Sequence, residues 1–415
     1  MTQIRILTVA IPFMMLLAPV YSGLVSEGET IKVLMIGQVF PFETPVAGWL
    51  DADPAFEYVV VPVRKDTGGW ADYPDKEARR YVRLYFPRDY QGLIGYDLLC
   101  YVDTYFGHLT GTQISYMYRG IRDEGLGALT TLGGGISWVT DFRESWVSSS
   151  VGSAFPTSYA QPPDGVKYVY DFRIDVRESG GIPAVFLPFL DLGIERHIGR
   201  QAAELRAREG AQIFATMETV GGETVPFAVA WEYGKGITWS VATDIQSDYN
   251  MWWTRWGSSS GYQYSMDLFL NMLLYSTKRE IIQDVLRFHN VRDKFSLCRR
   301  SKSTVFSLLD FVERFGASRE AIDREMEEVK AMEREARDLY LVQEIDAADE
   351  ALDAVLDQLD AVSVRAIQLK NRALVWVYIV EWAAVTATLM VSGFVIWTIM
   401  VKRRLYRIGG TTRMA

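Results

Sequence analysis

Cysteine and histidine are scarce in this chain of 415 residues, which contains two cysteines and three histidines. Two cysteines exclude a disulfide-rich scaffold and a metal site built from several cysteines. The histidines His108, His197 and His289 lie far apart, and none belongs to a paired motif such as H-E-x-x-H. The sequence therefore disfavours a zinc hydrolase, and we expect neither a metal nor a cofactor.

Basic residues are outnumbered by acidic ones outside the end of the chain. The formal net charge is −9, yet the tail 402–415 contains five basic residues and no acidic one. Between the two apolar runs at the ends of the chain, 37 basic residues face 51 acidic ones. An acidic surface repels the phosphate backbone of nucleic acids, so we expect no nucleic-acid partner.

Long apolar runs occur only at the two ends, which excludes a multi-span membrane protein. The first run predicts a signal peptide over residues 1–22. It has a positive start at Arg5, an apolar core over Ile6–Leu17 and a small-residue cleavage site at Val20–Ser22. An anchor helix that is not cleaved is the alternative, although two prolines interrupt the run.

The second run, Leu374–Val401, predicts one transmembrane helix, because its 28 residues contain a single charge, Glu381. Tryptophans near both ends are typical of membrane interfaces, and the basic tail 402–415 predicts the cytoplasmic side. We therefore expect a single-pass cell-membrane protein whose N-terminal domain is outside. Glu381 fits the outer headgroup level, since the 20 residues after it suffice to cross a bilayer. An acid that functions inside the membrane is the alternative.

Residues 23–277 have the pattern of an α/β domain. Short β-rich runs alternate with helical spacing over 112–123, and a closing amphipathic helix is expected over 264–277. The expected strands are 31–36, 56–63, 96–103, 128–132, 168–176, 211–217, 227–231 and 237–242. This strand–helix–strand rhythm predicts a flavodoxin-like parallel sheet sandwiched by helices.

The composition changes over residues 278–373, where glycine nearly vanishes and acidic residues dominate. Apolar residues recur there at helical spacing, with a phase break near Gln343. The two sets are Ile322, Met326, Val329, Ala336 and Tyr340, then Ile345, Ala348, Leu352, Val355, Leu359 and Val362. We expect an acidic α-helical stalk, either a hairpin or a coiled coil. An oligomerisation or signalling helix has the same pattern, so a homo-oligomer formed through the stalk is an alternative.

Four segments of the α/β domain, taken in order, resemble a known superfamily. They are Tyr96–Trp138, Trp231–Trp239, Thr243–Trp253 and Asp267–Leu274. The first combines an aspartate-ending strand, a helix and a strand that runs into glycines; the second contains a Y-G-K-G hairpin. Together they resemble the class I glutamine amidotransferase-like superfamily, nearest to its trehalose-utilisation-protein-like branch. The resemblance covers about residues 31–277 and implies an α/β fold with a ligand site at the edge of the sheet.

The residues for amidotransferase chemistry are missing. Such an enzyme needs a cysteine in a G-x-C-x-G turn and a histidine to take its proton. Cys100 lies within an expected strand and Cys298 in a helical region. Arginines after Cys298 could lower the pKa of its thiol, although we expect a packing role. Glu195 and His197 stand in the reverse of the required order, which predicts surface or helix-start residues. The sequence therefore predicts a pseudoenzyme.

Residues that follow the expected strands form a candidate ligand site. Glycines after a parallel strand can turn several backbone N–H groups toward one ligand, and α/β proteins bind ligands at this edge of the sheet. The expected lining residues are Asp103, Tyr105, Gly133, Gly134, Gly135, Ser137, Asp244, Trp252 and Trp253. Alternatively, the glycines only make a tight turn and the tryptophans only fill the core.

The expected function is binding of a small molecule or a protein partner by an extracytoplasmic module. A hydrolase or sugar-processing enzyme is the first alternative, with Asp103, Asp244 or Glu195 acting near the glycine loop. A structural or assembly protein that acts through its helical stalk is the second.

Overall fold

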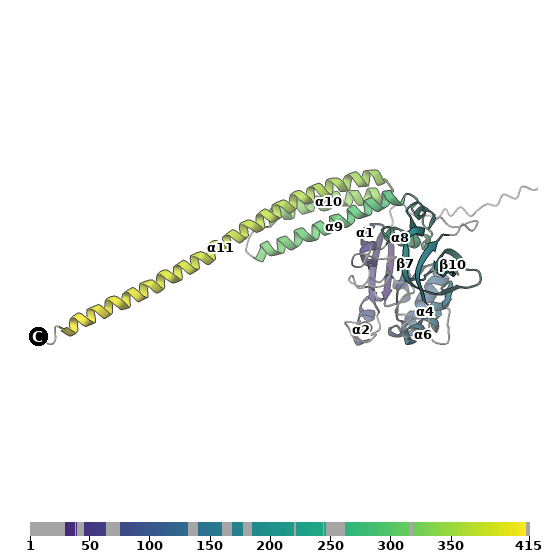
Figure 1. Ribbon diagram of the computed structural model, residues 1–415, viewed down its shortest axis with the longest axis horizontal. Helices are drawn as coiled ribbons and strands as arrows, with labels where there is room; N and C mark the ends of the chain where they lie inside the picture. Colours follow the sequence, from purple (N-terminus) through teal and green to yellow (C-terminus); the bar gives the residue numbers. More distant parts are fainter. Residues whose placement is uncertain are drawn as a thin grey trace, which may run out of the picture. The chain divides into compact units, whose positions relative to one another are not determined.

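A computed structural model describes residues 30–37, 39, 45–63, 75–131, 140–159, 168–176, 185–219, 221–243, 245, 262–314 and 319–411 (Figure 1). The chain divides into two compact units. The first comprises Met1–Trp49 and Phe56–Gln283, and the second comprises Leu50–Ala55 and Asp284–Ala415. A short piece of the N-terminal half of the sequence therefore belongs to the otherwise C-terminal unit.

In the described part of the first unit, nine strands form one sheet in the order β2-β1-β3-β4-β11-β10-β9-β6-β7. The bounds are β1 (Ile31–Gly37), β2 (Phe56–Pro62), β3 (Leu98–Val102), β4 (Gly127–Thr131), β6 (Tyr168–Asp175), β7 (Ile198–Ala203), β9 (Gln212–Thr219), β10 (Thr224–Tyr233) and β11 (Gly236–Val241). Two short strands, β5 (Thr157–Tyr159) and β8 (Leu205–Ala207), pair separately. Most of the expected strands are confirmed to within a few residues.

The expectation of a parallel sheet is right for one half and wrong for the other. Strands β2, β1, β3, β4 and β11 pair in parallel, whereas β11, β10, β9, β6 and β7 pair antiparallel. The connections explain two of these antiparallel pairs, β9 with β10 and β10 with β11. Parallel neighbours need a crossover of a dozen or more residues, and the short turns from β9 to β10 and from β10 to β11 permit only hairpins.

The described helices of the first unit are α1 (Val46–Ala52, whose last residues enter the second unit), α2 (Asp75–Tyr85), α3 (Tyr90–Leu93), α4 (Gly111–Arg119), α6 (Thr140–Val147), α7 (Ser150–Ser153) and α8 (Ser265–Ser276). Helices α1 to α4 connect the parallel strands β1, β2, β3 and β4 in βαβ fashion, and the other helices of the first unit follow β4 or β11. The expected helix over 112–123 is confirmed as α4 and the π turn Gly120–Glu124. It starts at a capping box, in which the Thr110 side chain accepts from the Gln113 N–H. Strands β3 and β4 are buried at every residue, as parallel strands covered on both faces require.

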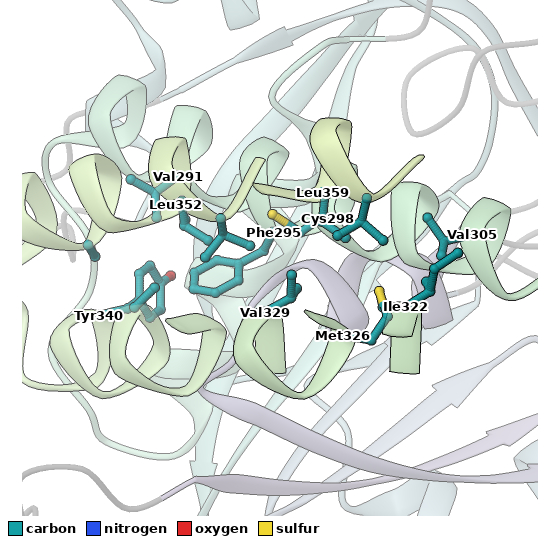
Figure 2. Close-up of a cluster of buried hydrophobic side chains, with 14 of the residues drawn as sticks. Val291, Phe295, Cys298, Val305, Ile322, Met326, Val329, Tyr340, Leu352 and Leu359 are labelled. Carbon is teal, nitrogen blue, oxygen red and sulfur yellow. The ribbon is translucent and has the colours of Figure 1, made fainter. Parts of the chain in front are cut away.

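Three helices lie side by side in the described part of the second unit (Figure 1). They are α9 (Val285–Arg314), α10 (Glu320–Leu341) and α11 (Ile345–Thr411). Both predicted apolar sets are buried, and Figure 2 shows Phe295, Val329 and Leu352 pointing into their common core. The phase break is a turn that separates α10 from α11, with Gln343 at φ 63°. Packing within one chain thus accounts for the helical pattern.

Helix α11 is 67 residues long, on the order of 100 Å at 1.5 Å per residue. Its most apolar part has a mean hydropathy of 2.0, and none of that stretch is buried. Large side chains such as Trp376, Leu389 and Trp397 are more than half exposed there. Within the described residues this is the one helix that is long and apolar enough to cross a membrane.

Candidate functional site

The parallel strands of the first unit end on a common row of paired residues. Gly37 of β1 pairs with Val102 of β3, Val102 pairs with Thr131 of β4, and Thr131 pairs with Val241 of β11. Neighbouring strands lie about 4.8 Å apart, so this row is roughly 14 Å wide. The residues directly after the row form the carboxyl edge, where α/β sheets bind ligands.

Asp103 is the first residue after β3 at this edge. Asp103 is 0% exposed, and its backbone has φ 45°, in the left-handed region that is uncommon for non-glycine residues, although aspartate and asparagine adopt it more often than most. A backbone held in such a region costs about 1–3 kcal/mol and is typical of functional sites. A carboxylate is also among the groups least often buried. Asp103 thus combines an uncommon backbone conformation with the burial of a carboxyl group.

Thr104 and Gly37 hold the ends of β3 and β1 close together. The Thr104 hydroxyl donates a hydrogen bond to the Ile36 carbonyl at 2.7 Å. Gly37 has φ 124°, and a Cβ placed on it would lie 1.9 Å from the Val102 carbonyl oxygen. The approach of the two strand ends therefore requires glycine at this position.

Polar side chains gather around the same row. Asp103, Thr104, Thr131 and Thr243 are each at most 1% exposed. The half-buried Tyr105 lies edge-on to the His108 ring, with 4.8 Å between the ring centroids. A purely structural core is mostly apolar, and buried polar groups are retained where they are bonded or used. This edge is thus the best candidate site in the described part of the first unit.

The structure describes two of the expected lining residues, Asp103 and Tyr105, and it brings both to the end of β3. The others lie outside the described residues: Gly133, Gly134, Gly135, Ser137, Asp244, Trp252 and Trp253. In sequence, the glycine run starts two residues after β4, and Asp244 lies three residues after β11. Sequence reasoning missed Gly37 and Thr104. The signal was present, because each stands where an apolar strand ends.

Glu195 does not belong to this edge. It lies on a short 3₁₀ turn, Ile194–Arg196, where it is exposed, as predicted, and its carboxylate accepts from the Val176 N–H at 3.3 Å. Val176 follows β6, which is five places from β3 in the sheet order, on the order of 20 Å away. Groups that share acid–base work must lie within contact distance, so Glu195 and Asp103 do not act together.

Both thiols are buried, and neither belongs to the residues of the candidate site. Cys100 lies in the middle of β3, and Cys298 lies in the core of the helical bundle (Figure 2). Burial raises the pKa of both, that of Cys298 to about 11. The idea that the arginines after Cys298 lower the pKa of its thiol is therefore wrong. Arg299 instead forms an ion pair with Asp51 at 2.9 Å. Since the thiolate is the nucleophile, both cysteines act as packing residues.

Comparisons with known proteins show no match to any family model and none to the curated proteins. Among solved structures, the chain is similar to Cytoplasmic Protein STM1381 from Salmonella typhimurium LT2, with 16% identity and a TM-score of 0.44. Cytoplasmic Protein STM3548 from Salmonella typhimurium has 15% identity and a TM-score of 0.42. Each match covers 59% of this chain and 99% of the other.

A β-galactosidase from Bacillus circulans sp. alkalophilus is also similar in part, with 10% identity and a TM-score of 0.33. The match covers 61% of this chain but only 32% of the galactosidase. These similarities do not assign a function to this chain. The resemblance to the amidotransferase-like superfamily stays a prediction.

Proposed function

We propose that this chain is a membrane-anchored, glutamine amidotransferase-like module that binds a ligand and lacks amidotransferase catalysis. Its site is the carboxyl edge around Asp103. The proposal rests on Asp103, which is buried, has a left-handed backbone conformation and lies beside the ends of four parallel strands. The inert thiols support the second half of the proposal.

The chemistry of the edge indicates the class of ligand. A carboxylate accepts hydrogen bonds and attracts positive charge, while Thr104 and Thr131 add hydroxyl groups. Ligands with hydroxyl or ammonium groups, such as sugars and amino acids, match these acceptors. The predicted neighbours Gly134, Trp252 and Asp244 extend the proposed site, with backbone donors, a stacking surface and a second carboxylate.

Asp103→Asn is expected to abolish ligand binding by the full-length protein in detergent. Asparagine keeps the size of the side chain and tolerates the left-handed backbone, so the fold should survive. The measurement is a thermal-shift screen with sugars, amino acids, glutamine and divalent cations. A ligand at 100 times its dissociation constant stabilises the native state by about 2.7 kcal/mol, which raises Tm by several degrees.

The matched control is Asp191→Asn, which removes an exposed carboxylate from the same unit. It should keep the full shift of the wild type. The proposal fails if Asp103→Asn shifts as much as the wild type does. It also fails if no compound in the screen stabilises the wild type.

We further propose that residues 374–401 of α11 cross the membrane, with the first unit outside and the basic tail 402–415 in the cytoplasm. A C-terminal tag should therefore survive protease added to right-side-out vesicles, while the first unit is digested. Inside-out vesicles should show the opposite pattern, and detergent should expose both parts. Loss of the tag in intact right-side-out vesicles would contradict this orientation.

A further inference from the structure

The first unit contains a cavity of about 280 Å³ that shares no lining residue with the carboxyl edge. One wall is the end of α6, with Trp146 and Val147, and Gly152 of α7 adds to it. The rest of its lining comes from β5, with Thr157 and Ser158, from Arg206 of β8 and from Arg208, the residue after β8.

Two arginines, Arg206 and Arg208, line this cavity. Arg206 of β8 is directly opposite Ser158 of β5 in the antiparallel pair. Arg208, the residue directly after β8, lines the same cavity. Arg206, Arg208 and Ser158 therefore line one space, and all three residues are exposed.

Hydrogen bonds hold Arg208 in place without neutralising it. Its Nε donates to the Thr157 carbonyl at 3.2 Å, and its Nη2 donates to the Gly152 carbonyl at 3.4 Å. Carbonyl partners leave the positive charge of the side chain uncompensated. Across the described ranges, neither Arg208 nor Arg206 forms an ion pair, although the chain has more acidic than basic residues.

We propose that this cavity binds a small oxyanion ligand, a phosphate or a carboxylate, between Arg206 and Arg208. The planar guanidinium presents paired donors that match the oxygens of both groups, and the Ser158 hydroxyl supplies a further donor. Trp146 and Val147 give the cavity an apolar wall for the uncharged part of the ligand. The volume lies near the lower end of small-molecule sites, so the ligand has few heavy atoms.

Calorimetric titration of the full-length protein in detergent tests this site with two probes, inorganic phosphate and acetate. The buffer has low ionic strength, because salt screens exposed charges. The wild type should bind at least one probe, and the stronger one identifies the class of oxyanion. The double variant R206Q/R208Q should weaken that binding at least tenfold while its unliganded Tm stays near the wild-type value.

Arg83→Gln is the matched control, because it removes the same charge from an exposed position on α2. It should bind the probe as the wild type does. Arg208→Lys, which keeps the charge but loses the planar fork, should bind with intermediate strength. The proposal is overturned if neither probe binds, if chloride at equal ionic strength binds equally well, or if R206Q/R208Q binds like the wild type.

Discussion

Arg292→Ala is expected to lower the free energy of unfolding of the second unit by about 3–5 kcal/mol. Arg292 is 0% exposed, and its Nε and Nη2 donate to one carboxylate oxygen of Asp53 at 2.9 and 2.6 Å. The other carboxylate oxygen accepts from the Ala55 N–H at 2.8 Å. The pair therefore ties the segment Leu50–Ala55 into this unit.

Tyr340 completes the buried network. Its hydroxyl donates to Asp53 at 2.9 Å, and burial raises its pKa well above the usual range, so it stays a neutral donor. Removing Arg292 leaves the Asp53 carboxylate buried with hydrogen-bond donors but without its cation. An uncompensated buried charge is far more costly than a lost surface ion pair.

Urea unfolding of the full-length protein in detergent, followed by helical circular dichroism, measures this loss. Arg300→Ala is the control, because Arg300 is exposed on the same helix; it should change stability by no more than about 0.5 kcal/mol. Replacing both partners, as Arg292→Met with Asp53→Leu, should cost less than Arg292→Ala alone. Equal midpoints for Arg292→Ala and Arg300→Ala would show that the pair does not stabilise the bundle.

Gly37→Ala is expected to destabilise the first unit by about 3–5 kcal/mol, whereas Gly48→Ala should stabilise it by about 0.5–1 kcal/mol. The added methyl group would be crowded at Gly37 and would have free space at Gly48. At Gly37 it would lie 1.9 Å from the Val102 carbonyl oxygen and 2.7 Å from the Thr104 hydroxyl, on a left-handed backbone. At Gly48, in α1, no atom lies within 4 Å, and alanine favours the helix.

Thermal and urea unfolding of the two variants should therefore shift in opposite directions. If Gly37→Ala does not fold, Thr104→Val tests the same contact, because it removes only the hydrogen bond to the Ile36 carbonyl. Its expected cost is about 1 kcal/mol. A Gly37→Ala protein as stable as the wild type, or an unchanged Thr104→Val protein, would mean that this strand junction is not tightly packed.

Local patterns predicted the elements well. Unbroken apolar runs such as Leu98–Val102 predicted strands, because parallel strands are buried on both faces. Helical spacing predicted which residues of α10 and α11 face inward, and the change of phase near Gln343 placed the turn between them. These patterns depend on residues that are close together in the sequence, and the folded structure keeps the elements that they predict.

The sequence by itself thus determined the α/β class, the helical segment, the apolar helix and the edge at which Asp103 lies. The tertiary structure decided the features made by distant residues. It set the antiparallel half of the sheet, the burial of Asp103, the pair of Asp53 and Arg292 at a separation of 239 positions, and the cavity at Arg206. Periodicity reports only which face of an element is apolar, and partner choice depends on the long-range packing of many elements at once.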